Sequence, residues 1–450
     1  EIDVQMMADD GDRVAEGNGG RETAGTSVQK TEDMGGRETA DTRVQKTEDM
    51  GGRQNQGDDN RDRAVSLLLL LTRTEFTDEE KVRVREDCAS FDGWKLFTDL
   101  AVGHGVAALA WQNISDLSLT SHVPEAERII MEGLRFKSIA RVTYITSVAA
   151  EVTAALEREG IRVVLLKGLA LEHTVYGSRG LRQMSDADLL VAPADALRAR
   201  DILVSAGFVS MPMKSKLYRH IILDIGNHLP ELRRGGMSVD LHYRLFSSEG
   251  VEMVAGAIAE AEEIDAAGNT FHVLPPVTAF LGLVSHIFKH DVKGEFQLRL
   301  YTDIYLLLRK HGPGIINSNL PAAAKQAGIQ GEVRVVLTVM QQVWGLKIPP
   351  EMEALPGQEQ KKAVRFMHDL MYPDLIRPES QRAMFNRNMS SLKGFRKKLI
   401  FITGDIFPSL HFMRQRYGCR TSLSAMLYYP HRLGKLVWVL GLLKAQKQDN

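Results

Sequence analysis

The sequence predicts an α+β fold, in which a small α/β core lies between two helical regions and follows a disordered N-terminal tail. Residues 151–250 carry three short runs with the composition of β-strands, separated by helix-like patterning. On either side, residues 63–150 and 251–450 have apolar side chains at helical intervals. Residues 1–62 instead hold a repeat with few apolar side chains. We therefore expect four segments, of which 151–250 carries the chemistry.

The composition is that of a globular protein without a strong overall charge. The chain has 450 residues, 44% hydrophobic and 25% charged, with a formal net charge of −1. This balance gives no general attraction to nucleic acid, so a nucleic-acid partner is not expected. Cys88 and Cys419 match neither a disulfide framework nor a zinc pattern, which favours a reducing, cytoplasmic location. The longest apolar runs, Leu67–Leu71 and Leu436–Leu443, are shorter than the roughly 20 residues that span a bilayer, so no transmembrane segment is expected.

The N-terminal tail contains a 16-residue repeat, because Gly19–Met34 recurs almost unchanged as Gly35–Met50 and Gly51-Gly52-Arg53 begins another copy. Such a period invites a solenoid interpretation. Val and Met are its only sizeable apolar side chains, however, so it buries too little surface to offset the entropy of ordering. We expect residues 1–62 to be disordered, with a flexible tether or a partner-binding arm as the functional alternative.

The helical regions follow from apolar spacing and from helix boundary signals. Order is expected to begin near Arg63, and residues 64–118 show helical spacing. A long helix is expected over Pro124–Arg158, where Pro124 suits the first turn and Gly160 the exit. After Pro276 the helix-like segments are 277–310, 321–344, 358–371 and 391–450.

The core segment alternates between strand-like and helix-like patterns. The strand candidates are Ile161–Leu166, Asp188–Val191 and Met237–Leu245, with helix-like patterning over 195–206. In the last of these strands Val239 and Leu241 face one way, and Asp240 and His242 face the other.

The acidic residues of this core are typical of a metal site. Asp186 and Asp188 are two apart at the start of a strand, so they lie on one face of the sheet and repel each other unless a cation neutralises them. Mg²⁺ suits a few carboxylates combined with substrate phosphate oxygens. Asp240, on another strand, can complete the site or act as a base toward an attacking hydroxyl. The alternative for the first pair is a solvated turn at the entrance of a strand.

Several residues near these acids are candidates for nucleotide binding. Gly168 follows a buried strand and lets the backbone approach a ligand, while Lys167 supplies a positive charge for phosphate. Arg182 can bind phosphate oxygens with two donors, and Ser185 directly precedes the acid pair. We consider His242, and His228 from the preceding segment, as candidate residues of the cleft, with a simple loop histidine as the alternative for His228.

Three motifs together resemble one known family. They are Leu165-Leu166-Lys167-Gly168, the segment Gly180–Val191, and Val239–Leu245. The sequence here is similar to the uncharacterised nucleotidyltransferase family of the polymerase-β-like superfamily, with weaker similarity over about residues 64–310. The resemblance implies a mixed sheet on which Asp186, Asp188 and Asp240 bind a divalent metal, Mg²⁺ or Mn²⁺, and a nucleoside triphosphate. The wider superfamily usually has Gly-Gly or Gly-Ser in place of Lys167-Gly168.

The sequence leaves three functional hypotheses. The first is metal-dependent transfer of a nucleoside monophosphate from an NTP such as ATP to an unknown acceptor, and the second is a catalytically weak nucleotide-binding or scaffold protein with the same fold. The third is a hydrolase with a metal at His286 and His290, but Ile287 stands where the zincin pattern needs Glu. Arg299 and Asp303 are expected to form a structural ion pair. Neither the acceptor nor the oligomeric state follows from the sequence.

Overall fold

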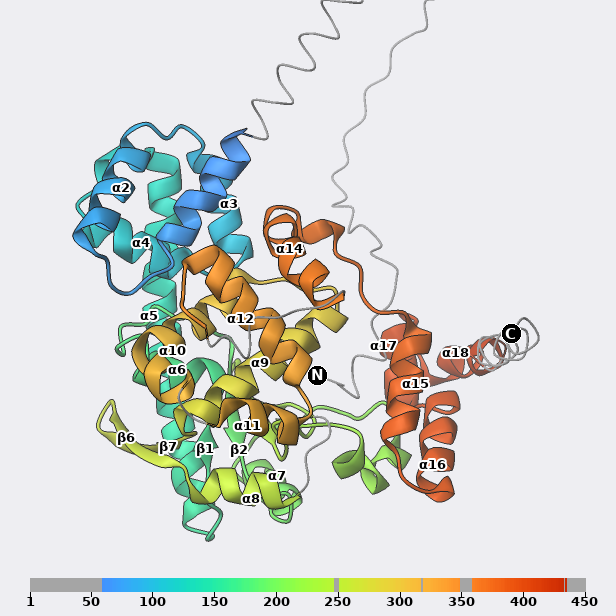
Figure 1. Ribbon diagram of the computed structural model, residues 1–450. Helices are drawn as coiled ribbons and strands as arrows, with labels where there is room; N and C mark the ends of the chain where they lie inside the picture. Colours follow the sequence, from blue (N-terminus) through green and yellow to red (C-terminus); the bar gives the residue numbers. More distant parts are fainter. Residues whose placement is uncertain (1–58, 247–250, 317–318, 349–357, 433, 435–450) are drawn as a thin grey trace, which may run out of the picture.

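The computed structural model describes residues 59–246, 251–316, 319–348, 358–432 and 434, and it shows a mostly helical protein built around one mixed β-sheet (Figure 1). This confirms the predicted α+β class. The predicted tail lies outside the described residues up to position 58. Its last residues belong to a helix over 59–70, so order begins earlier than Arg63. Arg61 Nη1 donates to the carbonyl oxygen of Met371 at 2.5 Å, which ties this helix to a segment far along the chain.

After the helix over 59–70, four further helices precede the sheet in the described part of the chain. They are α2 (Asp78–Ala89), α3 (Trp94–Gly103), α4 (Ala107–Asp116) and α5 (Glu125–Glu157), with the short 3₁₀ helix η2 (Thr120–His122) before α5. Thr77 and Glu80 cap the start of α2 reciprocally. The long helix predicted over Pro124–Arg158 is confirmed as α5, because its apolar residues pack on the sheet.

The helix α5 is long and apolar enough to cross a membrane, by length and composition alone. In its most apolar window 44% of the residues are buried within the protein. Core helices of globular proteins pass the same test, so this is a weak indication of a membrane span.

The sheet has the strand order β3-β4-β5-β2-β1-β7-β6. The pairs β1–β7 and β2–β5 are parallel, and the remaining pairs are antiparallel. The strands are β1 (Val164–Leu165), β2 (Asp186–Leu190), β3 (Val209–Ser210), β4 (Leu232–Arg234), β5 (Met237–His242), β6 (Glu262–Ala266) and β7 (Asn269–Val273).

The alternation of side chains along β2 and β5 divides the sheet into two faces. Ala187 and Leu189 of β2, with Val239 and Leu241 of β5, pack against α5 and α7 (Ala196–Ser205). The opposite face carries Leu190 and packs against α9 and α10. Asp188 lies two residues before Leu190 and therefore belongs to this second face.

Two features of the sheet differ from the sequence prediction. The expected strand Ile161–Leu166 is shorter in the structure, where β1 covers Val164–Leu165. The amide of Leu166 still donates to the carbonyl oxygen of Asp188, and α6 (Lys167–Thr174) begins at the next residue. The hairpin β6–β7 lies at 262–273, within the 251–450 region expected to be helical. Its turn uses Ala267 and Gly268 at φ of 50° and 75°, a conformation that matches the strand twist in tight hairpins.

Helices cover the second face of the sheet and continue toward the C-terminus (Figure 1). They are α8 (Val251–Ala259), α9 (Pro276–Val292), α10 (Leu298–Ile316), α11 (Leu320–Ala327), α12 (Gln330–Trp344) and α14 (Gln358–Met371), with η5 (Pro373–Leu375) after α14. The helical character predicted for 277–310, 321–344 and 358–371 is confirmed, and each of the first two segments contains two helices. Asn319, before α11, and Gly328, after it, mark boundaries that apolar periodicity alone does not show.

The last helices form a group at one side of the molecule (Figure 1). They are α15 (Gln381–Ser391), α16 (Phe395–Ile406), α17 (Leu410–Arg416) and α18 (Ser422–Met426). They pack against the 3₁₀ helices η3 (Lys216–His220) and η4 (Ile222–Asp224), where Tyr218 stacks on Phe401 with ring centroids 5.8 Å apart. Lys397 of α16 donates to Asp224 of η4 at 2.7 Å, which ties these two elements together. The apolar run Leu436–Leu443 lies outside the described residues.

Candidate functional site

The parallel pairing of β2 with β5 places Asp188 directly beside Asp240. Together with His242 they form a group whose possible ligand atoms all lie within 4.8 Å of one another. Asp188 and His242 are buried and Asp240 is half-buried. These positions follow from strand alternation, since the neighbouring Leu189 and Leu241 point into the apolar core on the other face. Within the described ranges this group of two carboxylates and one imidazole is the one that can hold a metal ion.

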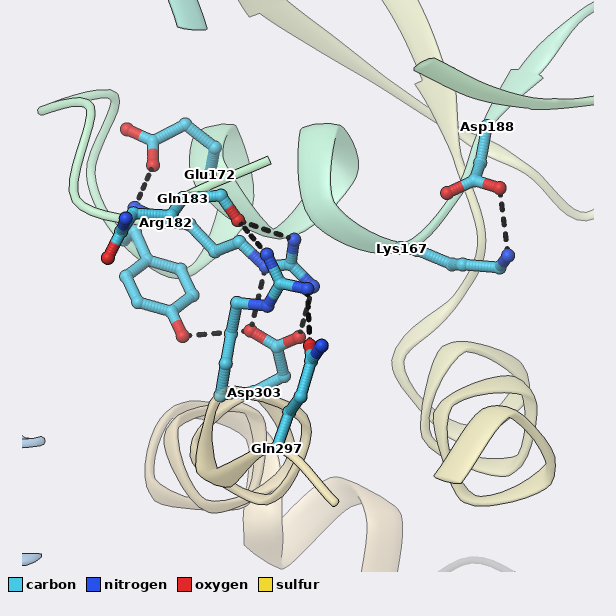
Figure 2. A network of polar contacts seen from close by, with 9 residues as sticks. Lys167, Glu172, Arg182, Gln183, Asp188, Gln297 and Asp303 are labelled. Carbon is cyan, nitrogen blue, oxygen red and sulfur yellow. Dashed lines mark hydrogen bonds and ion pairs between the residues drawn. The ribbon is translucent and has the colours of Figure 1, made fainter. Parts of the chain in front are cut away.

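Lys167 points at Asp188 of this group (Figure 2). Its Nζ donates to Asp188 Oδ1 at 2.8 Å and lies 3.4 Å from Nε2 of His242. The backbone of Lys167 has a φ of 49°, a left-handed conformation that costs a residue with a Cβ about 1–2 kcal/mol. Such strain is maintained where the surroundings fix it, and here it directs the ammonium group to the carboxylate.

His242 is neutral at physiological pH. Burial and, to a smaller extent, the Lys167 ammonium lower the pKa of its imidazole to about 3, against the opposing effect of Asp188. Its Nε2 lies 2.8 Å from Asp188 Oδ1, a hydrogen-bonding distance. A neutral imidazole retains a nitrogen lone pair, which is the form that binds metals.

Asp186 and Ser185, which precede Asp188 in the sequence, lie outside this group of three. Asp186 shares a face of β2 with Asp188, but its partner across the strands is Ser238, and it is not one of the three clustered residues. Ser185 is exposed, and its carbonyl oxygen accepts a hydrogen bond from Arg141. A metal role for Asp186 and a nucleotide role for Ser185 stay predictions.

Arg182, predicted to bind phosphate, has a protein partner in the structure. Its Nη2 lies 2.8 Å from Asp303 Oδ2 and its Nε lies 3.3 Å from Oδ1, and both side chains are buried. The hydroxyl of Tyr176 donates to the same carboxylate at 2.8 Å. Figure 2 shows this cluster apart from Lys167 and Asp188. The predicted ion pair between Arg299 and Asp303 is wrong. Asp303 pairs with Arg182 instead, and Arg299 donates to the carbonyl oxygen of Gln183 and to the side chain of Gln297.

The charges of this cluster support one another. Burial works to lower the pKa of the Arg182 guanidinium, but the Asp303 carboxylate outweighs burial, so the pKa is raised and Arg182 stays charged. On the same helix as Lys167, the buried Glu172 accepts hydrogen bonds from the backbone amides of Gly180 at 2.5 Å and Arg182 at 2.9 Å. The cluster therefore fixes α6 relative to the segment that leads into β2.

Gly168 has a packing requirement that the sequence did not reveal. A Cβ at this position would lie 2.7 Å from Nη1 of Arg182, closer than real Cβ contacts. The guanidinium has little room to move because Asp303 holds it by two contacts. We expect Gly168→Ala to lower the free energy of unfolding by about 1–3 kcal/mol, the usual cost of overpacking, as measured by denaturant titration. Gly103→Ala is the control, since a Cβ there meets nothing within 4 Å; equal stability of both variants would contradict this packing role.

The predicted histidines fall into two groups. The His228 ring lies beside that of His242, with centroids 5.2 Å apart, so it borders the metal group. His286 and His290 contact each other with centroids 4.6 Å apart, and His290 Nδ1 lies 2.6 Å from Glu295. Among the described residues this pair belongs to no group of three possible metal ligands. The structure thus gives the hydrolase hypothesis no completed site.

Comparison with known proteins identifies the wider relationship. No curated protein matches the chain. Residues 91–345, more than half of the chain, match the family described as uncharacterised nucleotidyltransferase. The matched segment includes the whole sheet, the group of Asp188, Asp240 and His242, and the Arg182–Asp303 pair. This chain belongs to the uncharacterised nucleotidyltransferase family.

Proposed function

We propose that this protein transfers a nucleoside monophosphate from an NTP to the hydroxyl or phosphate oxygen of an acceptor, using Mg²⁺ or Mn²⁺. The observation that carries the proposal is the convergence of Asp188, Asp240 and His242 beside the start of α6 in a nucleotidyltransferase family member. The amide groups at the start of α6 have no side-chain cap, and such a helix end favours phosphate.

The donor set fits a divalent cation. Two carboxylates and a neutral imidazole provide two oxygen ligands and one nitrogen ligand, which suits Mn²⁺ and is less favourable for Mg²⁺ than oxygen alone. When bound there, the cation supplies charge neutralisation for the triphosphate and Lewis acidity at the reacting phosphorus. Lys167 pairs with Asp188 in the structure. We infer that its side chain turns from Asp188 to the triphosphate when metal and nucleotide bind.

The reaction needs little covalent chemistry from the protein. A bond forms between the acceptor oxygen and the α-phosphorus, and the bond from that phosphorus to the leaving pyrophosphate breaks. The proton of an acceptor hydroxyl passes to a carboxylate, for which the half-buried Asp240 is our candidate. Lys167 balances charge on the leaving pyrophosphate.

The second candidate function is nucleotide binding without turnover, and the ion pair between Lys167 and Asp188 favours it. If that pair persists with nucleotide bound, the lysine excludes the cation. One experiment separates the two functions. The full chain is incubated with each of the four NTPs and Mg²⁺ or Mn²⁺ in a small-molecule extract, and pyrophosphate and nucleotidylated products are followed by mass spectrometry. Metal-dependent products support transfer, whereas NTP binding that is equal with and without metal, and yields no product, supports the binding protein.

Lys167→Ala is expected to change metal and nucleotide affinity in opposite directions. In the wild type the ammonium of Lys167 competes with Mn²⁺ for the Asp188 carboxylate. Without it, Mn²⁺ binds more tightly in the absence of nucleotide. The triphosphate loses a positive charge and binds more weakly, by about tenfold or more. Calorimetry with Mn²⁺ alone, and with a non-hydrolysable NTP, measures both affinities. Weaker Mn²⁺ binding would show that Lys167 supports the metal site instead of competing for it. Lys95→Ala is the control, since its ammonium pairs with Asp99 on the exposed surface of α3 and lines no part of the site.

A further inference from the structure

A cavity of about 440 Å³ adjoins the metal group. Its walls come from α6, α9, α10 and the hairpin β6–β7, and Lys167 and His242 line it as well. Its lining residues Leu166, Leu274 and Leu283 belong to the same apolar cluster as Leu190 of β2, so it lies on the face of the sheet that carries Asp188. The volume is within the usual range of small-molecule sites, about 300–1,000 Å³.

The lining combines aliphatic walls with an excess of positive charge. Leu171 of α6, Leu283 of α9 and Leu307 of α10 contribute to the aliphatic part of the wall. The described lining contains no Phe, Tyr or Trp, and its aromatic rings are the imidazoles of His173, His242, His286 and His311. The cationic side chains are Lys167, Arg244, Lys289 and Lys310, and the acidic ones are Glu262 and Asp265. In the described part of the chain no carboxylate forms an ion pair with the Arg244 guanidinium. Such a cavity favours a ligand that has both an aliphatic body and a negative charge.

Gly282 keeps this cavity open. It lies inside α9, where glycine is less favourable than alanine by about 1 kcal/mol. A Cβ at this position would meet no atom within 4 Å, so close packing does not require a glycine there. Because Gly282 lines the cavity, a larger side chain would enter space that a ligand can otherwise occupy.

We propose that the cavity binds the acceptor of the nucleotidyl transfer, and that this acceptor is a small molecule with an aliphatic body and a phosphate or carboxylate group. This inference rests on the proposed function. In the proposed reaction the triphosphate binds at the metal held by Asp188 and Asp240. Neither of these carboxylates lines the cavity, so the cavity is left for the acceptor. Lys167 and His242 border both spaces, so a ligand here lies next to the reacting phosphate.

The test uses three eight-carbon probes with the full chain. Octyl phosphate, octanoate and octanol are titrated by calorimetry, which separates the phosphate, carboxylate and neutral head groups. We expect at least one of the anions to bind about tenfold or more tightly than octanol. Equal binding of all three probes, or no binding of any, would overturn the proposal.

A cavity-filling variant locates the probe. Gly282→Leu is expected to weaken binding of the anionic probe by about tenfold or more while its melting temperature stays equal or rises, because leucine favours helix. Gly133→Leu is the matched control, since Gly133 lies exposed in α5, lines no part of the cavity and also has open space at its Cβ. Unchanged probe binding by Gly282→Leu would overturn the assignment.

Binding of Mg²⁺-ATP to the same variants separates this inference from the proposed function. Gly282→Leu is expected to leave ATP affinity unchanged, because the cavity excludes the metal carboxylates. If ATP binding weakens as much as probe binding, the cavity holds the nucleotide, and the acceptor assignment fails while nucleotidyl transfer stands. If no NTP is turned over by the wild type, the transfer proposal fails, and probe binding still decides whether the cavity takes an aliphatic anion.

Discussion

Asp188→Asn is expected to abolish nucleotidyl transfer, with a rate at least about a thousandfold below that of the wild type. The change keeps the shape of the side chain but removes one of two carboxylates that lie within 4.8 Å of each other and of His242. The cation then loses a charged ligand at the place where the triphosphate charge must be neutralised. Product formation under saturating NTP and Mn²⁺ is the measurement, with Mn²⁺ affinity followed in parallel.

The structure also gives this variant a stability cost. Two clustered carboxylates alone would repel each other, and the sequence suggests that removing one stabilises the metal-free protein. Lys167 Nζ, however, lies 2.8 Å from Asp188 in a mostly buried position, so the substitution leaves the ammonium without its counter-charge. We expect a loss of about 1–3 kcal/mol, which preserves the fold. Asp195→Asn, at the partly exposed pair with Arg198, is the control. Full activity of Asp188→Asn, with normal folding, would refute the metal site.

Arg182→Ala is expected to cause the largest stability loss of the proposed variants, about 3–5 kcal/mol, because it leaves the Asp303 carboxylate buried without its cation. Urea unfolding measures this. Arg179→Ala removes an arginine three positions earlier from an ion pair that is almost half exposed, and its expected cost is below about 1 kcal/mol.

The same variant decides between two roles for Arg182. If it fixes α6 relative to β2, the stability loss comes first and Asp303→Ala reproduces it. If it binds phosphate, as the sequence alone suggests, Arg182→Ala keeps normal stability and raises the KM for NTP without affecting folding. A normal unfolding midpoint would therefore exclude the positioning role.

The carboxylate positions were predictable because strand alternation is a local rule. Val239, Asp240, Leu241 and His242 alternate between apolar and polar, which is enough to place the acid and the imidazole on one face. The hairpin β6–β7 was missed, although Glu262–Val273 carries turn residues at its centre, because only part of the alternation is apolar. The start of α6 directly after β1 was missed as well, since its first residue takes a left-handed conformation that non-glycine residues rarely adopt.

The sequence by itself determined the α+β class, the long helix α5, the family resemblance and the acids Asp188 and Asp240, because each depends on spacing along one strand or helix. Only the tertiary structure decided the partners of the charged residues. Lys167 and Asp188 are 21 positions apart and Arg182 and Asp303 are 121 apart, so no local pattern shows which carboxylate each cation meets. Burial makes these pairings necessary, because a charged side chain removed from water needs an opposite charge beside it. Which opposite charge lies beside it depends on how α6, α10 and the sheet pack together.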